Sequence, residues 1–170
     1  MLVLGGSLGA RPLNQILPSV AHVLGAQCEW MHQSGVTDEP DVVRASMDLP
    51  NYRVSAFVED MASAYAWADL VICRAGALTV AELAVTGRPS ILIPLPHAID
   101  DHQTANARFL ADAGAAVLLP QARMAGELES LVLRLLNDGR ELERMSAAAR
   151  ACAQPMADER FVDALETLAA

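Results

Sequence analysis

Short apolar runs alternate along the chain with segments in which apolar residues recur every three or four positions. Such runs are typical of buried parallel strands, and the longer spacing is typical of helices that cover a sheet. The runs predict six strands, at 1–6, 28–32, 53–58, 70–74, 90–95 and 116–119. The helical spacing predicts five helices between them, at 12–24, 38–48, 60–68, 79–85 and 101–112.

The strands stop after residue 119, and three further helical patterns follow, the last of them from Phe161 to Leu168. Strands and helices in alternation predict an α/β fold: a doubly wound, Rossmann-like parallel sheet of about six strands with extra C-terminal helices. We expect residues 1–170 to form a single domain. Because the chain opens directly on a core strand, we also expect it to be one half of a larger protein, with Met1 an engineered start.

Charge and composition exclude several classes of protein. The 170 residues carry 12 basic and 21 acidic side chains, so the net charge is −9. All the basic residues are arginine, which excludes a Walker-A loop and a Schiff-base enzyme, because both need lysine. An acidic chain without a basic run is unsuited to nucleic acid. No apolar run approaches the roughly 18–20 residues of a transmembrane segment. The three scattered cysteines indicate free thiols in a reducing cytoplasm.

Ligands of such sheets bind beyond the carboxyl ends of the strands, and the first candidate loop there is Gly5-Gly6-Ser7-Leu8-Gly9-Ala10. Glycines let a backbone approach a ligand closely, and a helix that begins after such a loop offers free N–H groups to an anion. The alternative is a tight turn without a ligand. The spacing is not G-x-G-x-x-G, and His32 and Gln33 stand where NAD-binding folds carry an acidic residue, which counts against NAD.

The second candidate is the run from Arg74 to Glu82, RAGALTVAE. Gly76 follows a strand, and the amides of Ala77, Leu78 and Thr79 would stand at a helix N-terminus. Two readings of Glu82 are open. It is either half of a capping box in which Thr79 is the N-cap, or an acceptor for two ribose hydroxyls.

The third candidate is the polar stretch from His97 to Asn106. His97 and His102 are five residues apart, which does not match a helical zinc pair, so we expect no metal here. Asp101 is a plausible N-cap. His102, Gln103 and Asn106 share one helical face and would suit the hydroxyls of a sugar.

Other candidates carry simpler interpretations. The adjacent pair Glu59 and Asp60 is interpreted as a helix cap, with Asp60 as the capping residue. Trp30, Tyr65 and Trp67 are interpreted as packing residues.

Several of these segments together resemble the C-terminal half of the MurG family. They are GGSLGARPLNQ at 5–15, HQSG at 32–35, and the continuous stretch 57–116 that contains R-x-G-A-L-T-V-x-E and D-x-Q-x-x-N-A. The resemblance runs from Met1 to about Gln121. The MurG family comprises the bacterial UDP-N-acetylglucosamine:lipid I N-acetylglucosaminyltransferases of peptidoglycan synthesis.

The resemblance implies a GT-B glycosyltransferase, of which this chain would be the half that binds the UDP-sugar donor. It places Ser7 and Gly9 at the diphosphate, the backbone of Val58 at uracil, and Glu82 at ribose. Gly76, Ala77, Leu78 and Thr79 would lie at the phosphates and sugar, and His102, Gln103 and Asn106 at N-acetylglucosamine. The family commonly has glutamine where Leu8 and His102 stand, so Leu8 lacks one polar contact and His102 leaves the reading of the sugar hydroxyls open.

The implied reaction is an inverting transfer of N-acetylglucosamine to the 4-hydroxyl of lipid-linked muramoyl-pentapeptide (lipid I). Neither a metal nor another cofactor would be needed, because helix N-termini would stabilise the departing UDP. The catalytic base would belong to an N-terminal domain absent from this chain, which also would hold lipid I, so the chain alone is expected to be inactive. The whole protein would be cytoplasmic and peripheral on the inner face of the cytoplasmic membrane. Two alternatives stay open: a freestanding donor-binding subunit with a separate membrane partner, and another UDP-sugar or nucleotide-binding module.

Overall fold

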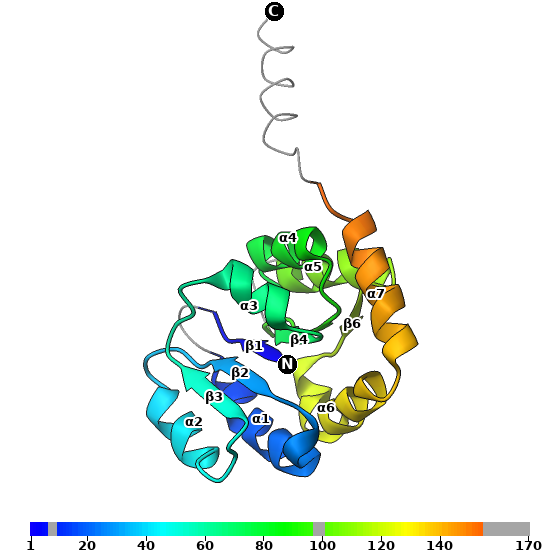
Figure 1. Ribbon diagram of the computed structural model, residues 1–170. Helices are drawn as coiled ribbons and strands as arrows, with labels where there is room; N and C mark the ends of the chain where they lie inside the picture. Colours follow the sequence, from blue (N-terminus) through cyan, green and yellow to red (C-terminus); the bar gives the residue numbers. More distant parts are fainter. Residues whose placement is uncertain (7–9, 97–100, 155–170) are drawn as a thin grey trace, which may run out of the picture.

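A six-stranded, all-parallel sheet forms the centre of the computed structural model, which describes residues 1–6, 10–96 and 101–154 (Figure 1). The strands lie in the order β3-β2-β1-β4-β5-β6, the order of doubly wound nucleotide-binding folds. The expected fold class is therefore confirmed. The strands are β1 (Leu2–Leu4), β2 (Trp30–Gln33), β3 (Tyr52–Ser55), β4 (Val71–Cys73), β5 (Ser90–Leu92) and β6 (Ala116–Leu118).

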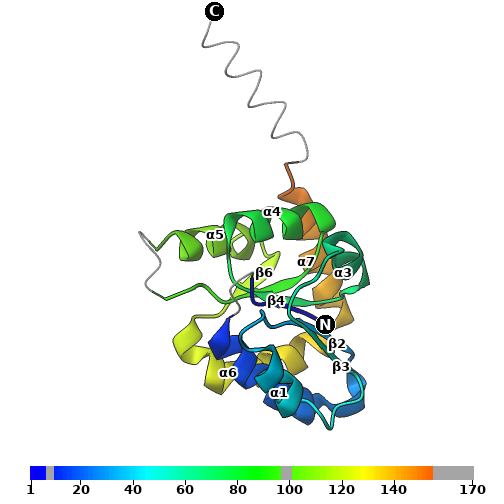
Figure 2. The same ribbon diagram turned by 90° about the vertical axis from the view of Figure 1, so that its left-hand side faces the viewer.

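Helices connect the strands and form a layer on each face of the sheet (Figures 1 and 2). Helices α1, α2 and α6 cover one face, and α3, α4 and α5 cover the other. The helices are α1 (Arg11–Leu24), η1 (Gly25–Gln27), α2 (Glu39–Ala45), α3 (Met61–Trp67), α4 (Ala77–Thr86), α5 (His102–Ala111), α6 (Gln121–Leu136) and α7 (Gly139–Ala151). The last expected helix, from Phe161 to Leu168, lies outside the described residues.

Alternating side chains of the strands build two separate hydrophobic cores. Val3 and Ile72 point into the first core, which lies under α1 and α6. Leu4 and Cys73 point into the second core, which lies under α3, α4 and α5. Because every strand of the interior is buried on both faces, its residues form a continuous apolar run, which is why the runs could be recognised in the sequence.

Helix α7 packs against both layers at the amino ends of the strands. Its Met145 belongs to the first core and its Ala149 to the second. Ser146 donates a hydrogen bond to the carbonyl of Gly87 (2.8 Å), the residue that ends α4 in the left-handed conformation. A side chain on Gly87 would also collide with Arg150. The opposite edge of the sheet, where the strands end, is left free of α7.

The connection from β1 to β2 leads to one side of the sheet, and the later connections lead to the other. β1 pairs with β2 on one side and with β4 on the other, so Leu4 lies beside both Gln33 and Cys73. This reversal between β1 and β4 is the place where doubly wound folds bind ligands. The loops after β1 and β4 therefore meet at one point of the carboxyl edge.

Candidate functional site

A pocket of about 780 Å³ opens at this point. Its size lies within the range of small-molecule sites, roughly 300–1,000 Å³. It is lined from the ends of β1, β2, β4 and β5 and the starts of α1, α3, α4 and α5, by Leu4, Gly5, Gly6, Ala10, Arg11, Pro12, Gln33, Phe57, Met61, Tyr65, Cys73, Arg74, Gly76, Leu78, Thr79, Glu82, Leu95 and Gln103. The two glycine-bearing loops thus share one pocket, as the sequence predicted.

Helix α4 directs its first turn at the pocket. Gly76 is the N-cap in an extended conformation (φ −64°, ψ 146°), and no side chain caps this end. The first-turn amides of Ala77, Leu78 and Thr79 have no partner within the helix, and they carry the positive end of the helix dipole. The capping-box reading is therefore wrong, because the helix begins two residues before Thr79, which stands inside the first turn.

The first loop brings a second helix start to the same pocket. Gly6 has a φ of +77°, a conformation that favours glycine, and the amide of Gly5 donates to the carbonyl of Gln33 (3.1 Å). Helix α1 then begins after Ala10, which offers no capping side chain. Ser7 and Gly9, which were predicted to face the diphosphate, lie outside the described residues.

A chain of hydrogen bonds from the first core holds the start of α1. Tyr52 and His32 are joined through Nδ1 at 2.7 Å, and Nε2 of His32 bonds the side-chain oxygen of Asn14 at 2.9 Å. Asn14 donates to a carboxylate oxygen of Asp38 (3.0 Å). The other oxygen of Asp38 accepts from Arg11, the first residue of α1, in a 3.0 Å ion pair. The chain connects the buried sheet to the rim of the pocket.

The geometry of this chain fixes its protons. The side-chain oxygen of Asn14 can only accept, so Nε2 of His32 carries the hydrogen and Nδ1 accepts from the hydroxyl of Tyr52. Burial lowers the pKa of His32 to about 4, so the ring is neutral near pH 7. The hydrogen bond from Asn14 and the neighbouring Arg11 lower the pKa of Asp38, which keeps the carboxylate ionised.

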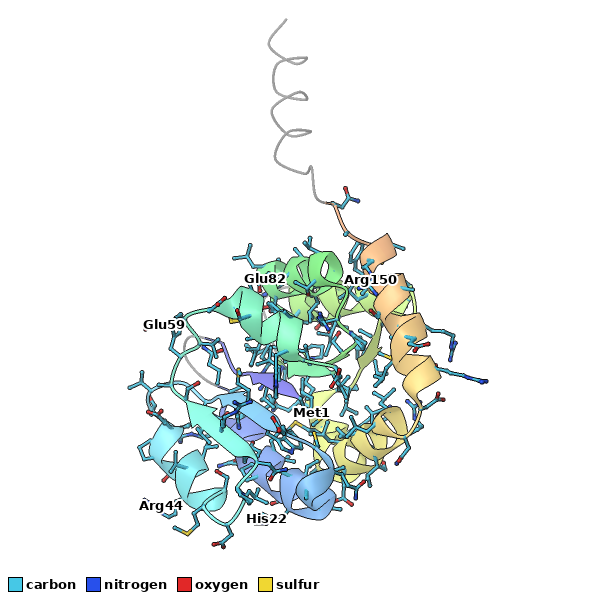
Figure 3. All side chains as sticks on the ribbon, viewed as in Figure 1. Met1, His22, Arg44, Glu59, Glu82 and Arg150 are labelled. Carbon is cyan, nitrogen blue, oxygen red and sulfur yellow. The ribbon has the colours of Figure 1, made fainter. Side chains whose placement is uncertain are left out.

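Glu82 lies on the exposed side of α4, close to α3 (Figure 3). Its Oε2 accepts a hydrogen bond of 2.8 Å from the hydroxyl of Tyr65 on α3. Both residues line the pocket. The sequence singled out Glu82 but interpreted Tyr65 as a packing residue. Its ring is indeed buried, but its hydroxyl reaches the site, and no local pattern shows a contact between residues 17 positions apart.

The predicted sugar-binding residues of α5 divide into two groups. Gln103 lines the pocket, and its Oε1 accepts from the amide of Leu95 (2.9 Å). Asn106 is half-buried behind the pocket lining and donates to the carbonyl of Ala75 (3.0 Å). His102 is exposed at the start of the helix and is not among the lining residues. Asp101 is the N-cap, but its carboxylate accepts from the hydroxyl of Thr104 and from no backbone amide of the helix.

The loop after β3 places Val58 and Phe57 differently. Val58 packs partly buried against the second core and does not line the pocket. Phe57 is 62% exposed and lines it. The predicted strand 53–58 was therefore too long: β3 ends at Ser55, and the apolar residues that follow leave the sheet for the pocket rim. Asp60 caps α3 as predicted, by accepting from the amide of Ser63 (3.0 Å).

Arg74 is a lining residue that the sequence did not single out by itself. Its guanidinium donates to the carbonyls of Ile93 (3.1 Å) and Pro94 (3.2 Å) and to the side chain of Gln121 (2.6 Å). Burial lowers the pKa of the guanidinium. Arg74 thereby joins the end of β4 to the loop after β5 and to the start of α6.

Comparison with known proteins identifies the family. The sequence model of the glycosyltransferase family 28 C-terminal domain matches residues 1–168. The chain belongs to this family. Two curated relatives are UDP-N-acetylglucosamine–N-acetylmuramyl-(pentapeptide) pyrophosphoryl-undecaprenol N-acetylglucosamine transferases. The one from Idiomarina loihiensis is 49% identical over 168 residues, and the one from Stutzerimonas stutzeri is 50% identical over 170 residues.

These matches cover 96% of this chain but only 46% and 47% of the two relatives. The chain thus spans about half the length of the curated relatives it matches. The crystal structure of Acinetobacter baumannii MurG is similar with a TM-score of 0.89 and 43% identity, over 98% of this chain and 49% of that protein. The likeness confirms the resemblance to the MurG family and its fold.

Two further properties concern metals and membranes. Within residues 1–6, 10–96 and 101–154, no three His, Cys, Asp or Glu side chains are grouped so that they could hold a metal ion. None of the described helices combines the length and the hydrophobicity needed to cross a bilayer. His97 and Asp100, which were weighed as metal ligands, lie outside the described residues.

Proposed function

We propose that this chain is the donor-binding half of an inverting glycosyltransferase. Its donor would be UDP-N-acetylglucosamine, and the sugar would pass to the 4-hydroxyl of lipid-linked muramoyl-pentapeptide in peptidoglycan synthesis. The observation that carries the proposal is the single pocket shared by the loops after β1 and β4, each followed by a helix start. The names of the relatives support this donor and this acceptor.

The residues of the pocket suit the parts of a UDP-sugar. The amides of Ala77, Leu78 and Thr79 offer hydrogen bonds and a positive dipole end to a diphosphate, and Ser7 and Gly9 would face it from the other loop. Glu82 offers carboxylate oxygens to the ribose hydroxyls. The backbone of Val58 would contact uracil. Gln103, Asn106 and His102 would contact N-acetylglucosamine.

The reaction follows from these contacts. The acceptor hydroxyl attacks the anomeric carbon from the face opposite UDP, the bond to UDP breaks, and the configuration inverts. Charge grows on the departing diphosphate, where the helix N-termini stabilise it without a metal or other cofactor. The base that removes the hydroxyl proton and the site for lipid I would lie on a domain outside this chain. That domain would bring the protein to the inner face of the cytoplasmic membrane.

Calorimetric titration tests the proposal directly. We expect the chain to bind UDP and UDP-N-acetylglucosamine, with UDP-glucose weaker and NAD weakest. A preference for NAD over UDP would refute the proposed donor. The chain by itself is expected to show no transferase activity.

Glu82→Ala is expected to weaken UDP binding by about 1–3 kcal/mol, because a charge-assisted hydrogen bond to the ribose is lost. The measurement is the dissociation constant of UDP for each variant. Glu59→Ala is the matched control, since Glu59 is also an exposed carboxylate near the start of α3 but does not line the pocket. Unchanged affinity in Glu82→Ala would remove the ribose contact.

Gln103→Ala is expected to weaken UDP-N-acetylglucosamine more than UDP, because its amide would bond the sugar and not the nucleotide. The expected extra loss is about 1 kcal/mol, the usual net contribution of one neutral hydrogen bond. Titration of both ligands against the same variant gives the difference. Equal losses for the two would assign Gln103 only to the support of Leu95, whose amide it accepts.

A further inference from the structure

The hydroxyl of Tyr65 is the contact within the pocket that the proposed function leaves unexplained. The ring belongs to the second core and is 2% exposed, while Glu82 stands on the exposed side of α4. The two are joined by the 2.8 Å hydrogen bond from the tyrosine hydroxyl to Oε2. A rigid, buried donor therefore holds one oxygen of a side chain that would otherwise have three rotatable bonds in solvent.

The hydrogen bond leaves most of the carboxylate free. Two carboxylate oxygens offer about four acceptor positions, and Tyr65 uses one of them. Oε1 of Glu82 makes no hydrogen bond to any other residue that the structure describes. Burial, followed by the hydrogen bond to Glu82, raises the pKa of Tyr65, so its hydroxyl remains protonated and always acts as the donor.

We infer that Tyr65 is a positioning residue for the nucleoside: its hydroxyl holds the Glu82 carboxylate in the orientation that accepts both hydroxyls of a ribose. The inference rests on the proposed function, since it takes the ribose of a UDP-sugar as the ligand of Glu82. Without Tyr65 the carboxylate would have to be ordered by the ligand itself, which weakens binding. The effect should concern the ribose hydroxyls and no other part of the ligand.

The test compares UDP with 2′-deoxy-UDP, which lacks one of these hydroxyls, by calorimetry on the wild-type chain and on Tyr65→Phe. The wild type is expected to prefer UDP. In Tyr65→Phe, UDP affinity is expected to fall about 3- to 10-fold, the range of a single hydrogen bond. The affinity for 2′-deoxy-UDP should fall less, so the preference for the ribonucleotide shrinks.

Tyr52→Phe is the matched control. Tyr52 is also a buried tyrosine with a hydrogen-bonded hydroxyl, but its partner is His32 in the first core, on the other face of the sheet. The same atom is removed, at a comparable cost in stability. We expect this variant to keep the wild-type preference for UDP over 2′-deoxy-UDP.

The outcomes separate the two proposals. If Tyr65→Phe keeps the wild-type preference, or weakens both ligands equally while its melting temperature falls, the positioning role is overturned. When Glu82→Ala removes the preference and Tyr65→Phe does not, the ribose contact of Glu82 stands and only this inference fails. If the wild type does not bind UDP, or Glu82→Ala leaves the preference intact, the ribose contact fails and this inference fails with it.

Discussion

Replacing Asn14 by alanine is expected to lower the free energy of unfolding by about 3–4 kcal/mol. Asn14 is 4% exposed and donates to the carbonyl of Ser34 (2.9 Å) and to Asp38, while it accepts from His32. Its removal leaves three buried polar groups without partners, each at a cost of about 1–3 kcal/mol if unrelieved. Denaturation by urea, followed by circular dichroism, measures the change.

Gln15→Ala is the control for this variant. Gln15 is the next residue of α1, carries the same functional group on a longer stem and is exposed. Its removal is expected to change the free energy of unfolding by no more than about 0.5 kcal/mol. A loss below about 1 kcal/mol in Asn14→Ala would mean that water or neighbouring groups replace its hydrogen bonds, against the tightly packed chain described above.

Acid is expected to remove about 3 kcal/mol of stability through His32 alone. Burial lowers the pKa of this residue from 6.5 to about 4, so the folded protein resists a proton that the unfolded chain accepts. The neutral ring therefore stabilises the fold fully above pH 6.5, and this contribution is lost as the pH falls toward about 4. Free energies of unfolding measured across this range give the slope.

His32→Gln and His22→Gln separate this effect from general acid destabilisation. Glutamine at position 32 does not titrate, so this variant is expected to lose much less stability than the wild type between about pH 6.5 and pH 4. His22 is exposed, and its replacement should leave the wild-type slope unchanged. Asp38 acts lower, since its pKa is lowered from 3.8. Equal slopes in wild type and His32→Gln would contradict the assignment.

The order of the strands and helices could be predicted because both faces of the sheet are buried. Each strand is then a short apolar run, and each connecting helix shows its own spacing. The ends of elements were less predictable. The run 53–58 continues past the end of β3 because Phe57 and Val58 are apolar for another reason: one lines the pocket and the other packs on the second core.

The candidate site was predictable where one loop carries the chemistry and less so where two helices share it. The two glycine-bearing loops were recognised from local residues and meet as expected. Thr79 and Glu82 have the spacing of a capping box, but Gly76 already takes the capping position with its backbone. The true partner of Glu82 is Tyr65 on the preceding helix, and only the folded chain brings them together.

Helix α7 has a consequence for how the domain comes apart. Because Met145 is anchored beneath one layer and Ala149 beneath the other, detaching this helix bares apolar surface on both faces of the sheet together. Neither layer can open without weakening its counterpart. The two cores, although separate in space, therefore behave as one cooperative unit, and the carboxyl-edge pocket keeps its shape for as long as that unit holds.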